Sequence, residues 1–264
     1  MKFKLALAQC RHDTVNGALS VVERYVNAAV EAGADLLVFP ESLMTPYEKE
    51  LGRFLAEAEP ADGPFAQAVS GLARDNGLWI VYTVNEANPG GNPFNTALVA
   101  DAEGNTALSY RKVHLFDSAT TRESDRMASG NELAVPVDSP FGRIGVGICY
   151  DLRFPEVARF ASTRDAKLML YPAAWVSGER KVGQWQALLR ARAVENAMFV
   201  AGLSRCDEGY IGMSCVYDPW GDLVAQAGPD EQLLVCEIDT DLVDEARKAI
   251  PVLSHRRPET YVEP

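Results

Sequence analysis

Cys149 stands where an apolar, strand-like run meets a turn. The run Ile144–Ile148 is rich in β-branched residues, a turn containing Pro155 follows the thiol, and a helical pattern begins just beyond it. Such a strand–turn–helix holds a sulfur at a sheet edge, where a neighbouring base and backbone N–H groups can reach it. Most free cysteines are small buried hydrophobes. The local pattern therefore leaves two interpretations open, a nucleophile and a core residue.

Two ionisable residues upstream complete a chemical set. Glu41 ends the apolar run Ala34–Pro40, and Lys112 lies in the stretch Tyr110–Asp117 between expected strands. Taken singly, a glutamate after a strand is usually a solvated loop residue and a lysine between strands is usually at the surface. Together with a thiol they supply a carboxylate base and an ammonium that balances developing negative charge.

Three stretches of the chain resemble the signature motifs of the nitrilase (carbon-nitrogen hydrolase) superfamily. They are Phe39–Ser42, Tyr110–Phe116 and Gly147–Glu156, and the resemblance extends from Ala6–Gln9 to Arg256–Tyr261. It implies an α/β fold, a four-layer α-β-β-α sandwich, formed by one carbon-nitrogen hydrolase domain over residues 1–264. It also implies that Glu41, Lys112 and Cys149 form a catalytic triad.

The residue types then define a reaction. A free thiol titrates at about 8.5 and is mostly neutral at pH 7, so Glu41 is expected to take its proton as Cys149 attacks an amide carbonyl. Lys112 and the backbone N–H of Tyr150 would stabilise the oxyanion. Ammonia leaves, a thioester remains, and water hydrolyses it. This covalent route needs no metal and no organic cofactor, and the histidines and cysteines show no metal-ligand spacing.

Glu123 has two interpretations. Amidases of the superfamily often carry a second glutamate near the triad, which implies that Glu123 positions the substrate amide and holds Lys112. The alternative is a surface loop acid beside Arg122, because this loop lacks the usual aromatic residue. His114 is interpreted as a packed or hydrogen-bonded loop histidine, since Glu41 already supplies the base.

Arg153, four residues after the thiol, also has two interpretations. It could bind a substrate carboxylate bidentately, or it could pair with Asp151 or Glu156 and hold the turn, which we slightly favour. Arg180 and Lys181 are further candidate cations for the acyl end of a substrate.

The resemblance also bears on the substrate. Tyr-Asp after the cysteine, in place of Trp-Glu, favours the amidase branches, and the motifs lie nearest to omega-amidase, which acts on 2-oxoglutaramate, and to deaminated glutathione amidase. Gly183-Gln184-Trp185 departs from both, because they usually carry a His before this Trp. Other aliphatic or N-carbamoyl amides stay open as substrates, and so does a non-catalytic interaction protein, although the intact triad argues against it.

Composition limits the partners and the compartment. The chain has 25 basic and 37 acidic residues, a net charge of −12, which argues against nucleic acid and anionic membranes. Five cysteines without regular spacing suggest free thiols in a reducing compartment, the cytoplasm. The first residues are predicted to be a strand and not a signal peptide, and no apolar stretch is long enough to cross a bilayer.

Two pairs of similar segments within the sequence predict that the chain consists of two related halves. Ala34–Pro40 is matched by Ala166–Pro172 at an offset of 132 residues, and Leu5–Cys10 is similar to Arg143–Cys149. Helices are predicted over residues 21–32, 156–162 and 185–197, and further strands over residues 78–84, 95–100, 108–112, 199–203 and 234–238. Members of the superfamily that the chain resembles usually pair through helices at the positions of residues 185–197 and of the helix after the Cys149 turn, which implies a homodimer. The C-terminal tail of about 247–264 is expected to pack at its interface, and a tail folded on its own subunit is the alternative.

Overall fold

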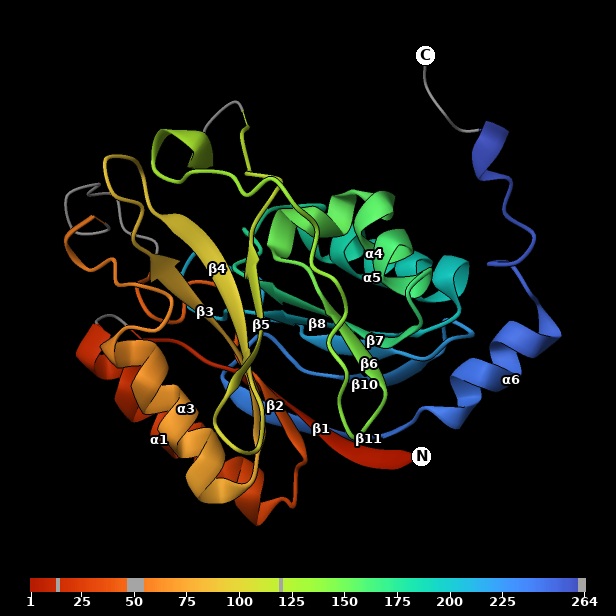
Figure 1. Cartoon of the computed structure of the whole chain (residues 1–264), viewed down its shortest axis with the longest axis horizontal. Coiled ribbons are helices and arrows are strands. Elements are labelled where there is room, and N and C mark those ends of the chain that lie inside the picture. The colour runs from red at the N-terminus through yellow and green to blue at the C-terminus, as the bar shows by residue number, and fades with distance from the viewer. Residues whose placement is uncertain (13–14, 47–54, 119–120, 261–264) are drawn as a thin grey trace.

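Two β-sheets pack against each other with helices on both outer faces in the computed structural model of the chain (Figure 1). The structure describes residues 1–12, 15–46, 55–118 and 121–260. The first sheet has the order β11-β1-β2-β3-β4-β5 and the second has the order β10-β9-β8-β7-β6. This is the α-β-β-α sandwich expected from the sequence.

The bounds of the elements are as follows. The first sheet contains β1 (Lys2–Gln9), β2 (Leu36–Val38), β3 (Trp79–Glu86), β4 (Phe94–Ala100), β5 (Thr106–Arg111) and β11 (Gln232–Asp239). The second contains β6 (Arg143–Val146), β7 (Ala166–Ala173), β8 (Phe199–Ser204), β9 (Cys215–Tyr217) and β10 (Leu223–Gln226). The α-helices are α1 (Val15–Glu31), α3 (Pro64–Asn76), α4 (Pro155–Ser162), α5 (Lys181–Asn196) and α6 (Asp241–Ala249), and 3-10 turns cover Glu123–Asp125, Cys149–Arg153 and Pro258–Thr260.

The two halves repeat one topology. In the first, β1, β2 and β3 are parallel, and β4 and β5 follow as antiparallel neighbours. In the second, β6, β7 and β8 are parallel, and β9 and β10 follow in the same way. Helices α1 and α4 connect the first two strands of each half, and α3 and α5 precede the third. The similar sequence segments therefore lie on equivalent strands of the two halves, β2 with β7 and β1 with β6.

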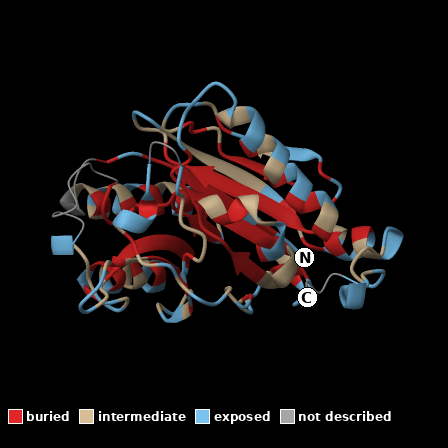
Figure 2. Ribbon diagram, turned by 90° about the horizontal axis from the view of Figure 1, so that it is seen from above, coloured by how far each residue is buried: buried red, intermediate tan, exposed pale blue. Residues whose placement is uncertain are grey.

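Side chains that point alternately to the two faces of the first sheet belong to two separate apolar clusters. In β1, Leu5 and Leu7 join the cluster that includes the second sheet, α4 and α5, whereas Ala6 and Ala8 join the cluster under α1 and α3. Successive side chains of a strand point to opposite faces, so both faces of the first sheet are covered. Figure 2 shows the buried strands enclosed by helices whose outer faces are exposed.

Four helices and strands were not predicted from the sequence, and two predicted helices begin earlier than expected. Helices α3 and α6 and strands β9 and β10 were not predicted, α1 begins at Val15 and not at residue 21, and α5 begins at Lys181 and not at residue 185. None of the helices in the described ranges combines the length and the apolar composition that crossing a bilayer requires.

Candidate active site

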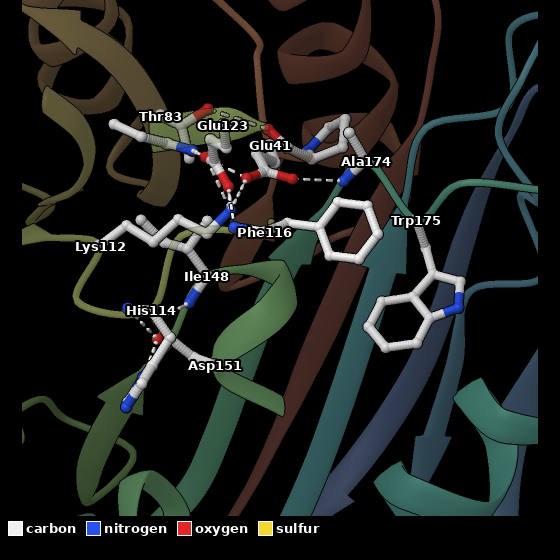
Figure 3. Close-up of polar contacts among 12 residues, drawn as sticks. Glu41, Thr83, Lys112, His114, Phe116, Glu123, Ile148, Asp151, Ala174 and Trp175 are labelled. Carbon is white, nitrogen blue, oxygen red and sulfur yellow. Dashed lines mark hydrogen bonds and ion pairs between the residues drawn. The ribbon is translucent and has the colours of Figure 1, made fainter. Parts of the chain in front are cut away.

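Four of the predicted site residues line one cavity, at the edge where strands from both sheets end. Glu41 follows β2, Lys112 follows β5, Glu123 lies on the 3-10 turn of the connecting loop, and Cys149 follows β6. Strands β2 and β6 belong to different sheets, so Glu41 and Cys149 meet where the two sheets face each other. Figure 3 shows the polar contacts that fix the acidic side of this cavity.

The Glu41 carboxylate is held from three sides. Its Oε1 lies 2.8 Å from Lys112 Nζ and accepts a hydrogen bond of 2.8 Å from Asn95 Nδ2, and its Oε2 accepts one of 2.8 Å from the Ala174 N–H. Thr83 stabilises the turn that carries Glu41, because its hydroxyl donates to the Pro40 carbonyl at 3.2 Å and accepts the Leu43 N–H at 3.2 Å. The carboxylate direction is therefore fixed before any substrate binds.

Lys112 lies between two carboxylates. Its Nζ is 2.8 Å from Glu41 Oε1 and 2.9 and 2.8 Å from the two oxygens of Glu123, and all three side chains are buried. Its backbone N–H donates to the Asn95 carbonyl at 2.8 Å, which extends the pairing of β4 with β5 by one residue. The buried ammonium therefore has a fixed position at the end of the sheet.

Glu123 belongs to this cluster and is not a surface acid. It is 2% exposed, and its Oε2 also accepts the N–H of Phe116 at 2.6 Å. The alternative of a surface loop acid beside Arg122 is wrong, because Glu123 is buried against Lys112 and Arg122 pairs with Asp125 instead.

Cys149 begins the 3-10 turn with a left-handed backbone, φ 45°. A non-glycine residue in this region is strained and is held there by its surroundings. The strand that leads to the thiol is closely packed, since a Cβ on Gly147 would come within 2.8 Å of the Tyr171 ring. Burial, followed by the charge of Glu41, raises the pKa of the Cys149 thiol, and Lys112 opposes this only in part. The thiol is therefore neutral at pH 7.

A second pocket adjoins the thiol and carries aromatic rings and two cations. Its lining includes Phe116, Cys149, Tyr150, Arg153, Ala174, Trp175, Val176 and Lys181. The Arg153 guanidinium lies over the Trp175 ring at 5.0 Å, and Lys181 Nζ lies 5.1 Å from the centre of the Phe116 ring. Arg153 also donates to Gln184 Oε1 at 2.8 Å, and it pairs with neither Asp151 nor Glu156. Arg180 is exposed and does not line the pocket.

Three contributors were not predicted from the sequence. Asn95 contacts Glu41, and the Ala174 N–H binds the same carboxylate. Asp151 makes two buried and two partly buried polar contacts in the turn that begins at Cys149. His114 donates its N–H to Asp151 and stacks on Phe154 at 3.6 Å, which agrees with a packed, hydrogen-bonded histidine. No cluster of three or more metal-ligating side chains occurs among the described residues.

The sequence profile of carbon-nitrogen hydrolases matches residues 4–248. The chain belongs to the carbon-nitrogen hydrolase family. It is 32% identical to omega-amidase NIT2-A of Xenopus laevis, over 98% of this chain and 97% of that protein, and 36% identical to a hydrolase of Mycobacterium tuberculosis, over 96% and 95%. Carbon-nitrogen hydrolases of this kind act on carbon–nitrogen bonds other than peptide bonds.

Solved structures agree with this assignment. The NitFhit protein of Caenorhabditis elegans superposes with a TM-score of 0.91 at 31% identity, and the match covers 99% of this chain and 66% of that one. An amidase from Nesterenkonia sp. AN1, solved with acrylamide added to its active-site cysteine, superposes with a TM-score of 0.83 at 28% identity, over 98% of both chains. The chain is therefore a carbon-nitrogen hydrolase of the amidase type.

Proposed function

We propose that this hydrolase cleaves a small linear carboxamide whose far end carries a carboxylate, as in the omega-amide 2-oxoglutaramate. One observation carries the proposal. Arg153 and Lys181 line the pocket that contains Cys149, and neither forms an ion pair with a carboxylate of any described residue. Two cations beside a nucleophile fit an anionic acyl group that reaches the thiol at its other end.

Acylation begins with a neutral thiol. The sulfur of Cys149 attacks the amide carbonyl carbon while Glu41 takes the thiol proton. Lys112 and the N–H of Tyr150 stabilise the negative charge on the carbonyl oxygen. Glu41 then gives its proton to the amide nitrogen, the carbon–nitrogen bond breaks, and ammonia leaves with the thioester bound to Cys149.

Deacylation uses the same base. Glu41 removes a proton from water as the water oxygen attacks the thioester carbonyl. The carbon–sulfur bond then breaks, the thiolate takes the proton from Glu41, and the carboxylic acid product is released. The enzyme returns to its starting protonation state.

The charges support this proton path. Glu41, Glu123 and Lys112 together carry one net negative charge, and Cys149 is neutral. When Glu41 is protonated, the negative charge moves to the substrate oxygen, and the total in the buried site does not change. Glu123 meanwhile keeps Lys112 charged and in place. Charge that moves within a preorganised site avoids most of the reorganisation that water would require.

An ammonia-release assay over a panel of amides tests the proposal. The panel contains 2-oxoglutaramate, 2-oxosuccinamate, deaminated glutathione, an N-carbamoyl amino acid and propionamide. We expect the highest kcat/KM for an omega-amide with a free carboxylate. A preference for propionamide would indicate an apolar acyl pocket and an aliphatic amidase, and a preference for deaminated glutathione would assign the chain to that branch.

We also infer that the enzyme is a cytoplasmic homodimer. Its five cysteines are free thiols, which suits a reducing compartment. The tail after α6 runs away from the sandwich in Figure 1, and Ile250 at its start is 57% exposed. An exposed apolar side chain at the start of this tail suits packing against a second copy. Tyr261 and the residues after it lie outside the described part of the chain.

A further inference from the structure

Asp151 is a buried carboxylate that the proposed reaction does not use. It lies in the 3-10 turn of Cys149 and is 0% exposed. Its Oδ2 accepts hydrogen bonds of 2.8 Å from the Ile148 N–H and 2.8 Å from the Tyr110 hydroxyl. Its Oδ1 accepts a hydrogen bond of 3.2 Å from the backbone N–H of His114 and lies 2.7 Å from Nδ1 of the His114 ring. A buried carboxylate needs such a full set of donors.

These donors come from both segments that carry the reacting groups. Tyr110 and His114 are two residues before and two residues after Lys112, and Ile148 directly precedes Cys149. The Tyr110 hydroxyl also accepts the Val113 N–H at 3.3 Å, so the segment is held on both sides of Lys112. One carboxylate therefore links the backbone before the thiol to the backbone around the ammonium (Figure 3).

The link is rigid for two further reasons. Burial, followed by the Asp151 charge, raises the pKa of Tyr110, so its hydroxyl stays protonated and remains a donor. The His114 ring is fixed between the carboxylate and the Phe154 ring, on which it stacks at 3.6 Å with an interplanar angle of 11°. Charge-assisted hydrogen bonds of this kind are short and directional.

We propose that Asp151 is a positioning residue, which fixes the Lys112 ammonium relative to the sulfur of Cys149 and therefore sets where the oxyanion is stabilised. This role rests on the proposed function, because it matters only if Lys112 stabilises the oxyanion. Displacing a catalytic group by about 1 Å can cost on the order of 100-fold in rate. A neutral amide at position 151 keeps the size but presents N–H groups to donors, so at least one of the four contacts is lost.

The test compares Asp151→Asn with the wild type on the best amide of the panel, at a temperature where circular dichroism shows both proteins folded. We expect kcat to fall about 10- to 100-fold and KM to change by less than about threefold. Alkylation of Cys149 by iodoacetamide, which needs no oxyanion donor, should become no faster. Tyr110→Phe removes one donor and should lower kcat about three- to tenfold.

A matched variant controls for simple loss of stability. Tyr25→Phe also removes a buried tyrosine hydrogen bond, 3.1 Å to the Gln9 carbonyl in the layer under α1, and should leave kcat unchanged. If Asp151→Asn does not fold, the comparison of Tyr110→Phe with Tyr25→Phe decides. An unchanged kcat in folded Asp151→Asn would overturn the positioning role. Faster alkylation of Cys149, in proportion to the loss of kcat, would also overturn it, because it would mean that the turn around the thiol has opened. A wild type that hydrolyses no amide would overturn the proposed function first, and this role with it.

Discussion

Glu41 and Lys112 form a salt bridge of 2.8 Å in which each side chain is only 2% exposed. Two buried charges remain charged because each compensates the other, and removing one partner from such a pair costs about 3–5 kcal/mol of stability. In a Lys112 variant, a loss of activity could therefore not be distinguished from a loss of folded protein. Nearly isosteric changes of the carboxylates test the chemistry more cleanly, since they keep the volume and most of the hydrogen bonds.

Replacing Cys149 by Ala should abolish turnover and leave the fold intact, because the sulfur forms the covalent intermediate. Mass spectrometry of the wild type, quenched in acid during turnover of a slow substrate, should show an acyl adduct on Cys149. Cys236→Ala, at a half-buried free thiol on β11, is the control and should keep full activity. A Cys149→Ala protein with a tenth of wild-type activity would contradict the mechanism.

Glu41→Gln should reduce kcat about 10³- to 10⁴-fold, near the upper end for loss of a general base, because both half-reactions use the carboxylate. Iodoacetamide should also alkylate Cys149 more slowly in this variant. The control is Glu86→Gln, a buried carboxylate that pairs with Arg111 and Thr96, and its turnover should change little. Unchanged turnover together with unchanged alkylation in Glu41→Gln would remove Glu41 from the reaction.

The acyl pocket makes a prediction about KM. Arg153→Met and Lys181→Met should each raise KM for a carboxylate-bearing amide about 10- to 100-fold, from roughly 1.5–3 kcal/mol of lost charge-assisted bonding. The KM for propionamide should not change. Arg180→Met removes an exposed cation next to the same segment and serves as the control. If Arg153→Met and Lys181→Met both bind the anionic amide like the wild type, the carboxylate does not lie between Arg153 and Lys181.

The same pocket predicts a pH dependence. Burial, followed by the neighbouring charge of Arg153, lowers the pKa of Lys181 from its ordinary value of 10.5. Lys181 therefore loses its charge at a lower pH than a free lysine, and attraction for a carboxylate weakens as the pH rises. We expect KM for the anionic amide to begin to increase at a pH below the 10.5 of a free lysine, with no such increase for propionamide. In Lys181→Arg, which stays charged, the rise should disappear.

The dimer is tested by removing the tail. Light scattering of the full chain at micromolar concentration should give twice the chain mass. Deletion of residues 250–264 should shift the equilibrium towards the monomer, because the exposed side chain of Ile250 and the apolar residues after it no longer cover the partner. A full-length protein that scatters as a monomer would refute the assembly.

The sandwich and the cluster could be predicted because Glu41 and Cys149 end apolar runs and because three stretches of the sequence resemble the nitrilase superfamily. Lys112 lies in the mixed stretch Tyr110–Asp117, so only the resemblance distinguishes it from a surface lysine. The partners of Glu41 were missed for a physical reason. Ala174 contributes only its backbone N–H, and a backbone group cannot be recognised from the residue type. Asn95 resembles any polar residue at the start of a strand until the position of Glu41 in the fold is known.

The two missed strands have little periodicity of their own. Strand β9 has only three residues, and β10 is largely exposed, so neither shows a buried alternation. Helix α3 buries Ala66 and Ala73 beside Phe65 and Val69, and alanine adds little to an apolar pattern. The role of Glu123 could not be decided, because a three-residue turn gives no pattern from which burial could be inferred.

The repeated topology of the two sheets has a consequence for how the site is assembled. The proposed base follows β2 in one unit and the thiol follows β6 in the other, and the Ala174 N–H of the second unit binds the carboxylate of the first. One five-stranded unit alone would therefore hold the base or the thiol, but not both. The proposed reaction requires the two units to pack sheet against sheet, so the packing that completes the fold also completes the site.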